Sequence, residues 1–148
     1  MKLLFLSAVL FGTVAVAQNA TSLEETKIKK VILAETMAYE QESMDAWEDT
    51  VTKSTNMTFV YGLADGTRGH INGYDNIKTL VQEWMDGEED TYEFIERSNW
   101  NIKINGNQAW ATFREKATVN GQTTIGEEIR ILEKIDGKWK LDVIAFIF

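Results

Sequence analysis

Four ionisable side chains in the second half of the chain are spaced so that they could act together. Along a strand, successive side chains point to opposite faces of the sheet. This alternation is expected to place four ionisable residues on one otherwise apolar face: Glu96, Glu115, Glu128 and Arg130. In the expected register Glu96 lies opposite Glu115, and Glu128 lies opposite Phe113. Two facing carboxylates are unfavourable unless one is protonated or a cation bridges them. Such a group could bind a polar ligand or supply a general acid and base.

The same four residues also have a purely structural interpretation. If this end of the sheet is open to water, the carboxylates are simply solvated. Arg130 then forms a structural ion pair with Glu128 or Glu115. The two interpretations differ in whether the charges are enclosed.

Most other chemistries are disfavoured by composition. His70 is the single histidine and there is no cysteine, which argues against a histidine-rich zinc site, a disulfide and thiol chemistry. No glycine-rich phosphate loop follows a strand, so we expect neither a metal nor a cofactor. The formal net charge of −8 disfavours nucleic acid and anionic membranes as partners.

The elements that would position the four residues are strands joined by tight turns. Asn105-Gly106, Asn120-Gly121 and Asp136-Gly137 are each flanked by segments rich in β-branched and aromatic residues, which predicts two-residue hairpin loops. The sequence therefore predicts a four-stranded meander, with strands at about 91–104, 107–119, 122–135 and 138–147.

Helical periodicity dominates the first half of the chain. It predicts a helix over about 23–40 capped by Ser22, a short helix beginning at Asp45, and a third helix between Asn72 and Gly87. A further strand is expected from Met57 to Leu63. The apolar stripes of the helices are expected to cover one face of the sheet.

The opposite face of the sheet is also partly apolar. The expected register places Trp110, Ile129, Ile131 and Ile144 there. An apolar surface of this size is unfavourable in water, so we expect a homodimer formed through the sheet. Coverage by a loop or by the chain terminus is the alternative.

The first seventeen residues have the composition of a secretory signal peptide. Lys2 precedes an apolar run that ends in Ala15-Val16-Ala17, and the run is too short to span a membrane. We therefore expect a signal peptide over 1–17 and one domain over 18–148, exported to the periplasm or secreted.

Three segments carry a resemblance to a known family. They are Gly73-Tyr74-Asp75-Asn76-Ile77, the run from Gly106 to Phe113, and the run from Arg130 to Leu141 that includes Asp136-Gly137-Lys138-Trp139. The chain resembles the SnoaL-like branch of the nuclear transport factor 2-like superfamily. The resemblance implies an α+β cystatin-like roll, in which a cone-shaped, curved antiparallel sheet and three helices enclose a pocket. It also implies dimerisation through the sheet.

Two functions remain open. The first is a binding domain for a small molecule, with Tyr39, Trp47 and Trp100 as apolar walls and Arg130 orienting a polar group. The second is a cofactor-independent lyase, isomerase or hydrolase that uses Glu96, Glu115 or Glu128 as general base. We prefer binding, because a general base here lacks an electrophilic partner apart from Arg130.

Overall fold

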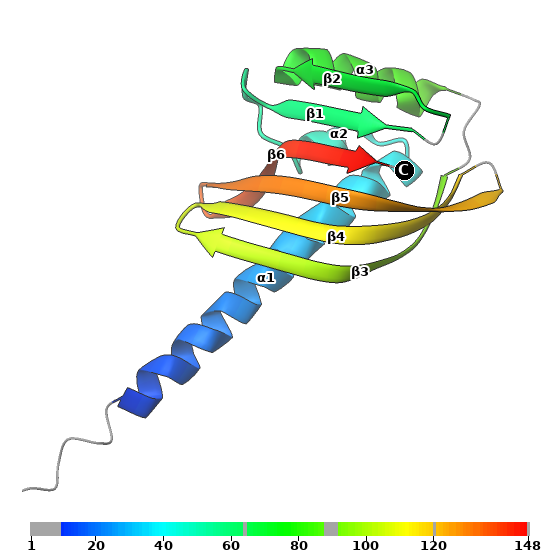
Figure 1. The fold of residues 1–148 in the computed structure, drawn as a ribbon. Helices are drawn as coiled ribbons and strands as arrows, with labels where there is room; N and C mark the ends of the chain where they lie inside the picture. The colour runs from blue at the N-terminus through cyan, green and yellow to red at the C-terminus, as the bar shows by residue number, and fades with distance from the viewer. Residues whose placement is uncertain (1–9, 64, 88–91, 120, 148) are drawn as a thin grey trace, which may run out of the picture.

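The fold is a curved six-stranded sheet with helices against one of its faces (Figure 1). The computed structural model describes residues 10–63, 65–87, 92–119 and 121–147. Helix α1 packs against β3 and β6, α2 packs against α1, and α3 packs against β1 and β2. We call the face that these helices cover the inner face, and the opposite one the outer face.

The helices are α1 (Leu10–Glu40), α2 (Met44–Glu48) and α3 (Tyr74–Asp86). Helix α1 begins earlier than expected and runs through the predicted cleavage site after Ala17, so Ser22 lies inside it and does not cap it. The cap of α2 is Ser43, whose hydroxyl accepts from the Ala46 amide at 3.3 Å. Helix α3 begins after Gly73 and ends at Gly87, the stop that the sequence predicts.

The strands are β1 (Thr58–Gly62), β2 (Arg68–Asn72), β3 (Tyr92–Asn105), β4 (Gln108–Val119), β5 (Gln122–Ile135) and β6 (Lys138–Ile147). Their order in the sheet is β2-β1-β6-β5-β4-β3. Strands β3 to β6 form the predicted antiparallel meander, whereas β1 pairs in parallel with β6.

Strand β2 was not expected, because its sequence is short, polar and interrupted by Gly69. Gly69 faces Tyr61 of β1, and a β-carbon added at Gly69 would lie within 2.5 Å of the Tyr61 ring. The glycine therefore lets the aromatic ring lie across the strand.

The first loop of the meander differs from expectation by one residue. Asn105 pairs with Gln108, so the loop is Gly106-Asn107, and the register of β3 on β4 shifts accordingly. Two further irregularities follow along β3, one between Ser98 and Asn101 and one between Phe94 and Glu96. Asn99, in the first, adopts a positive φ of 55°, a conformation that asparagine tolerates better than most residues.

A third irregularity, between Ile131 and Leu132 of β5, changes which β6 residues face the helices. Ile131 pairs with Val143, and Arg130 with Ile144, so the expected placement of Ile144 on the outer face is wrong. Ile144 is completely buried, and Phe146 packs against Phe59, with 5.7 Å between the ring centroids.

One continuous core joins the inner face to all three helices. Its largest fully buried side chains are Ile28, Ile32, Trp47, Met57, Phe59, Ile77, Val81, Phe113, Leu132, Leu141 and Ile144. Among the described residues, no helix combines the length and the apolar character needed to cross a membrane.

Candidate functional site

Five ionisable side chains meet within this core and form what we call the charge cluster. Its members are Glu35 of α1, Arg97 of β3, Glu115 of β4, and Glu128 and Arg130 of β5, each with a side chain no more than 5% exposed. Fully buried charges are rare in proteins unless they are paired. The cluster is therefore an unusual feature of an otherwise apolar face.

Arg97 and Glu115 form the first pair of the cluster. They are direct cross-strand partners, and two guanidinium nitrogens lie 2.5 and 2.7 Å from the same Glu115 oxygen. The remaining donors of Arg97 reach α1, where Nη1 donates to the Ile32 carbonyl at 3.3 Å and Nη2 to the Thr36 hydroxyl. Arg97 thus fastens the sheet to the helix.

Arg130 is the centre of the second part of the cluster. Its Nη1 lies 2.5 Å from Glu128 Oε2 and 3.2 Å from the Ala145 carbonyl oxygen. Its Nη2 lies 3.7 Å from Glu35 Oε2, a longer and weaker contact. Glu35 is therefore the less well compensated of the two carboxylates.

An aromatic ring lies close to both guanidinium groups. The Phe113 centroid lies 5.1 Å from the Arg97 guanidinium carbon and 5.6 Å from that of Arg130. The Trp100 ring stacks on Phe113, with 4.3 Å between their centroids. Cations close to an aromatic face gain additional stabilisation when they are shielded from water.

The cluster carries three carboxylates against two guanidinium groups. Burial raises the pKa of Glu35, although Arg130 and Arg97 oppose this effect. Burial likewise raises the pKa of Glu128 to about 7, again with Arg130 acting in the opposite direction. One excess negative charge in a buried site favours uptake of a proton, and Glu35 and Glu128 are the groups placed to hold it.

The arrangement offers both a proton donor and a proton acceptor at neutral pH. A protonated carboxyl at Glu35 or Glu128 can donate a hydrogen bond, and its ionised neighbour can accept one. Among the described residues, no group of three acidic or histidine side chains is arranged to hold a metal ion. The cluster is thus suited to polar recognition or proton transfer.

The expected site residues fall into two sets. Glu115, Glu128 and Arg130 lie together on the inner face, and Glu128 is opposite Phe113 as the register predicts. The expected inward position of Glu96 is wrong. Glu96 is exposed and pairs with Lys116, because the bulges of β3 turn Arg97 inward in its place.

The three expected aromatic walls are also separated. Trp47 is fully buried, and Tyr39 places its hydroxyl in the interior. Trp100 lies against Phe113, and the Lys29 amine is 5.2 Å from the Trp100 ring centroid. Tyr39 is one helical turn beyond Glu35 of the cluster, whereas Trp100 lies against Phe113.

Sequence reasoning missed Glu35 and Arg97, although both left a signal. Glu35 occupies the position between Ile32 and Tyr39 in the apolar stripe of α1, where a charge must face the core. Asn99 is a poor strand residue within an otherwise regular strand, and it indicates the bulge that reorients Arg97.

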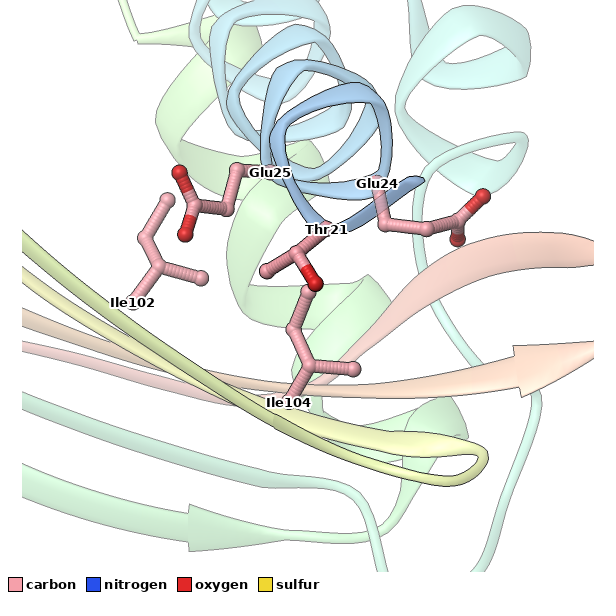
Figure 2. Close-up of a pocket in the computed structure, with 5 residues that line it drawn as sticks. All are labelled: Thr21, Glu24, Glu25, Ile102 and Ile104. Carbon is pink, nitrogen blue, oxygen red and sulfur yellow. The ribbon is translucent and has the colours of Figure 1, made fainter. Parts of the chain in front are cut away.

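A surface hollow of about 260 Å³ lies elsewhere, between the N-terminal part of α1 and β3. Figure 2 shows its lining, with Thr21, Glu24 and Glu25 on the helix above Ile102 and Ile104 on the strand. Glu24 is held there by Lys134 at 2.5 Å and by the Trp139 indole at 2.8 Å. Glu24 and Glu35 are separated by roughly 16 Å of helix, so the hollow is distinct from the charge cluster.

Comparison with known proteins gives structural but not sequence similarity. No protein-family model matches the chain, and no curated protein matches it in sequence.

Three solved structures illustrate the structural similarity. A nuclear transport factor 2-like protein of unknown function from Pseudomonas putida has a TM-score of 0.70 at 11% identity, covering 85% of this chain and 87% of that one. A nuclear transport factor 2-like superfamily protein from Salmonella enterica has a TM-score of 0.66 at 20% identity, covering 85% and 91%. A protein from Novosphingobium aromaticivorans, provisionally called a scytalone dehydratase, has a TM-score of 0.65 at 12% identity, covering 87% and 86%.

These similarities define the class of fold. The chain has the nuclear transport factor 2-like fold, and other structural neighbours are described as cystatin-like. The expected fold class is thereby confirmed. At these identities the similarity concerns architecture alone, and function has to be argued from the site.

Proposed function

We propose that the protein is an exported domain of the SnoaL-like branch that binds a small molecule at the charge cluster, between α1 and the inner face of the sheet. The ligand would contact the aromatic side chains Tyr39 and Trp47 and would be oriented by Arg130. No metal or cofactor is part of this proposal.

The single observation that carries the proposal is the burial of five ionisable groups on an apolar face. Packing alone does not require them, because buried ion pairs can often be replaced by apolar residues of similar volume without loss of stability. Polar groups converging in an apolar site are the usual composition of a small-molecule site. Two of the structural neighbours are themselves described as proteins of unknown function, so they name no shared ligand.

Mass spectrometry of the protein purified from its native host tests this function. We expect a non-covalent ligand that is present under native conditions and lost on denaturation. The double variant Glu128→Leu/Arg130→Met removes a whole ion pair and should remain folded while losing the ligand. The matched control is Arg114→Met/Glu127→Leu, which removes an exposed cross-strand pair and should retain the ligand. A native protein without any ligand, or a cluster variant that keeps it, would contradict the proposal.

The second candidate is a cofactor-independent lyase, isomerase or hydrolase. It is favoured by the pKa of Glu128, which burial raises to about 7, a value suited to acid–base work at neutral pH, and by the neighbouring Glu35, whose pKa burial also raises. Incubating the recovered ligand with the protein distinguishes the candidates. Unchanged ligand supports binding, and a product whose rate of formation is lost in Glu35→Gln supports catalysis.

A further inference from the structure

Two carboxylates of the charge cluster depend on one guanidinium group. Arg130 lies 2.5 Å from Glu128 and 3.7 Å from Glu35, whereas Arg97 is paired with Glu115. All five side chains are no more than 5% exposed, so water at the surface screens their charges little. The cluster is therefore neutral when Glu35 or Glu128 holds a proton, and it carries one net negative charge when neither does.

The neighbouring elements do not change this charge balance. The phenol of Tyr39, one helical turn beyond Glu35 on α1, stays neutral because burial raises its pKa well above the usual value. From β6 comes the uncharged Ala145 carbonyl, which accepts from Arg130 at 3.2 Å. On α2, which packs against α1, Glu48 is paired with lysines outside the cluster. The two carboxylates that share Arg130 thus set the net charge of the cluster.

These two carboxylates lie on elements that differ in their freedom to move. Glu128 is on β5, which is paired with β4 on one side and β6 on the other. Glu35 is on α1, whose far side faces water, because Leu33 and Met37 of this helix are 39% and 42% exposed. A small shift of α1 can therefore hydrate Glu35, whereas β5 cannot move without breaking two ladders of hydrogen bonds.

A second contact between α1 and the sheet does not involve this proton. Arg97 donates to the Ile32 carbonyl at 3.3 Å and to the Thr36 hydroxyl. Both acceptors are uncharged, so a rise in pH leaves them unchanged. One turn of α1 is thus held by a contact that is independent of pH, next to a contact that is not.

We propose that the charge cluster is a pH-sensitive switch, which holds α1 on the sheet while Glu35 and Glu128 share one proton and loosens the helix when both are ionised. Burial raises the pKa of Glu128 from 4.5 to about 7 in the closed form, whereas a hydrated carboxyl releases its proton near 4.5. Opening therefore releases a proton, and each pH unit between about 5 and 7 favours the open form about tenfold more. Above that range the closed form has lost the proton too, and the effect levels off.

Amide hydrogen exchange of the full chain between pH 5 and 8 tests the switch, after correction for the intrinsic pH dependence of exchange. We expect the protection of the α1 amides of residues 33–39 to fall by about 10- to 100-fold between pH 5 and 7. The amides of Leu132 in β5 and Leu141 in β6 should remain better protected at each pH, because α1 opens before the sheet unfolds.

Three variants separate the switch from a general loss of stability. Glu35→Gln and Glu128→Gln each leave two carboxylates against two guanidinium groups, so the pH dependence of α1 protection should disappear in both. Glu40→Gln, at an exposed residue of the same helix, is the matched control and should retain it. Thr36→Val removes a contact that does not titrate, so it should lower α1 protection at every pH and keep the pH dependence.

Three results would overturn the switch. The first is α1 protection that is constant between pH 5 and 7, and the second is protection equal to that of the sheet amides at each pH, which would show global unfolding alone. The third is a pH dependence that survives in either glutamine variant. None of them bears on ligand binding, which the mass-spectrometric experiment above tests separately.

Discussion

Arg97 and Glu115 face each other across the β3–β4 ladder with their charged atoms 2.5 Å apart, and both side chains are almost completely buried. A second cross-strand pair, Arg114 with Glu127, has similar contact distances but side chains that are 48% and 68% exposed. The sheet thus contains one buried and one exposed arginine–glutamate ion pair between neighbouring strands.

We expect Arg97→Met to lower the free energy of unfolding by about 3 to 5 kcal/mol, because it leaves Glu115 buried without its cation. The matched variant Arg114→Met should lose only about 0 to 1 kcal/mol, the range of exposed pairs. Urea denaturation of both variants measures the difference. Equal losses would show that the cluster is hydrated.

Arg130→Met should be destabilising by a similar amount, about 3 to 5 kcal/mol, because Glu128 loses the cation at 2.5 Å. Adding Glu128→Leu should restore most of the loss, since the unpaired buried carboxylate is then removed as well. A double variant no more stable than Arg130→Met would contradict this account. The measurement is again the free energy of unfolding at constant pH.

The pH dependence of stability should have a maximum near pH 5. The pKa of Glu128 is raised from 4.5 to about 7, so the folded protein holds a proton that the unfolded chain releases, and stability falls as pH rises through 7, by on the order of 3 kcal/mol. Glu24 and Glu48 act in the opposite sense. Lysine side chains lower both pKa values to about 2, so their contribution is lost as pH falls from about 4.5 towards 2.

Thermal unfolding between about pH 4 and 8 tests this profile. Glu128→Gln should flatten the decline above pH 5, because the amide has no proton to lose. Glu127→Gln, at the exposed neighbouring position, should leave the decline unchanged. A decline that persists in Glu128→Gln would assign the proton to Glu35, and Glu35→Gln would then remove it.

We propose that the outer face forms a homodimer. Its exposed apolar side chains are Trp110, Ile125, Ile129 and Ile147, which are between 46% and 63% exposed. Ile129→Lys should convert dimer to monomer in sedimentation equilibrium, whereas Leu23→Lys, at an exposed apolar residue of α1, should not. A parent protein that is monomeric at micromolar concentration would refute the proposal.

We also propose that export removes residues 1–17. The first residue of the protein recovered from its native host should then be Gln18, and N-terminal mass spectrometry measures this directly. An intact Met1 in the native host would contradict the proposal.

The sequence predicted the structure best where the residues of a single turn or helix end determine the local conformation. The Asp136-Gly137 loop and the end of α3 at Gly87 are where the turn and capping rules place them. Alternation also brought Glu115, Glu128 and Arg130 to one face, because β4 and β5 pair without irregularity along that stretch.

The rest of the site depends on departures from regular alternation. Three side chains of β3 reach the inner side although they lie three residues apart: Phe94, Arg97 and Trp100. Regular alternation would place neighbours in this series on opposite faces, but one bulge lies between the first two residues and another between the last two. Glu35 comes from a helix, so no strand register could have placed it beside Arg130. The positions of Glu35 and Arg97 depend on helix packing and on bulges, which the regular alternation of side chains along a strand does not predict.

The bulge at Asn99 makes β3 tolerant of a change in length at one point. It adds one residue to β3 relative to β4 between Ser98 and Asn101, so loss of that residue would remove the bulge and leave Arg97 opposite Glu115. With both bulges retained, a one-residue loss in the regularly paired stretch 101–105 would instead shift the register of the preceding segment and reverse its facing. Glu96 would then take the place of Arg97, and the interior would hold four carboxylates against one guanidinium. The position of a length change along β3 therefore decides whether the interior charge is kept or becomes more negative, which offers evolution or an engineer a way to alter ligand preference without substituting any residue of the site.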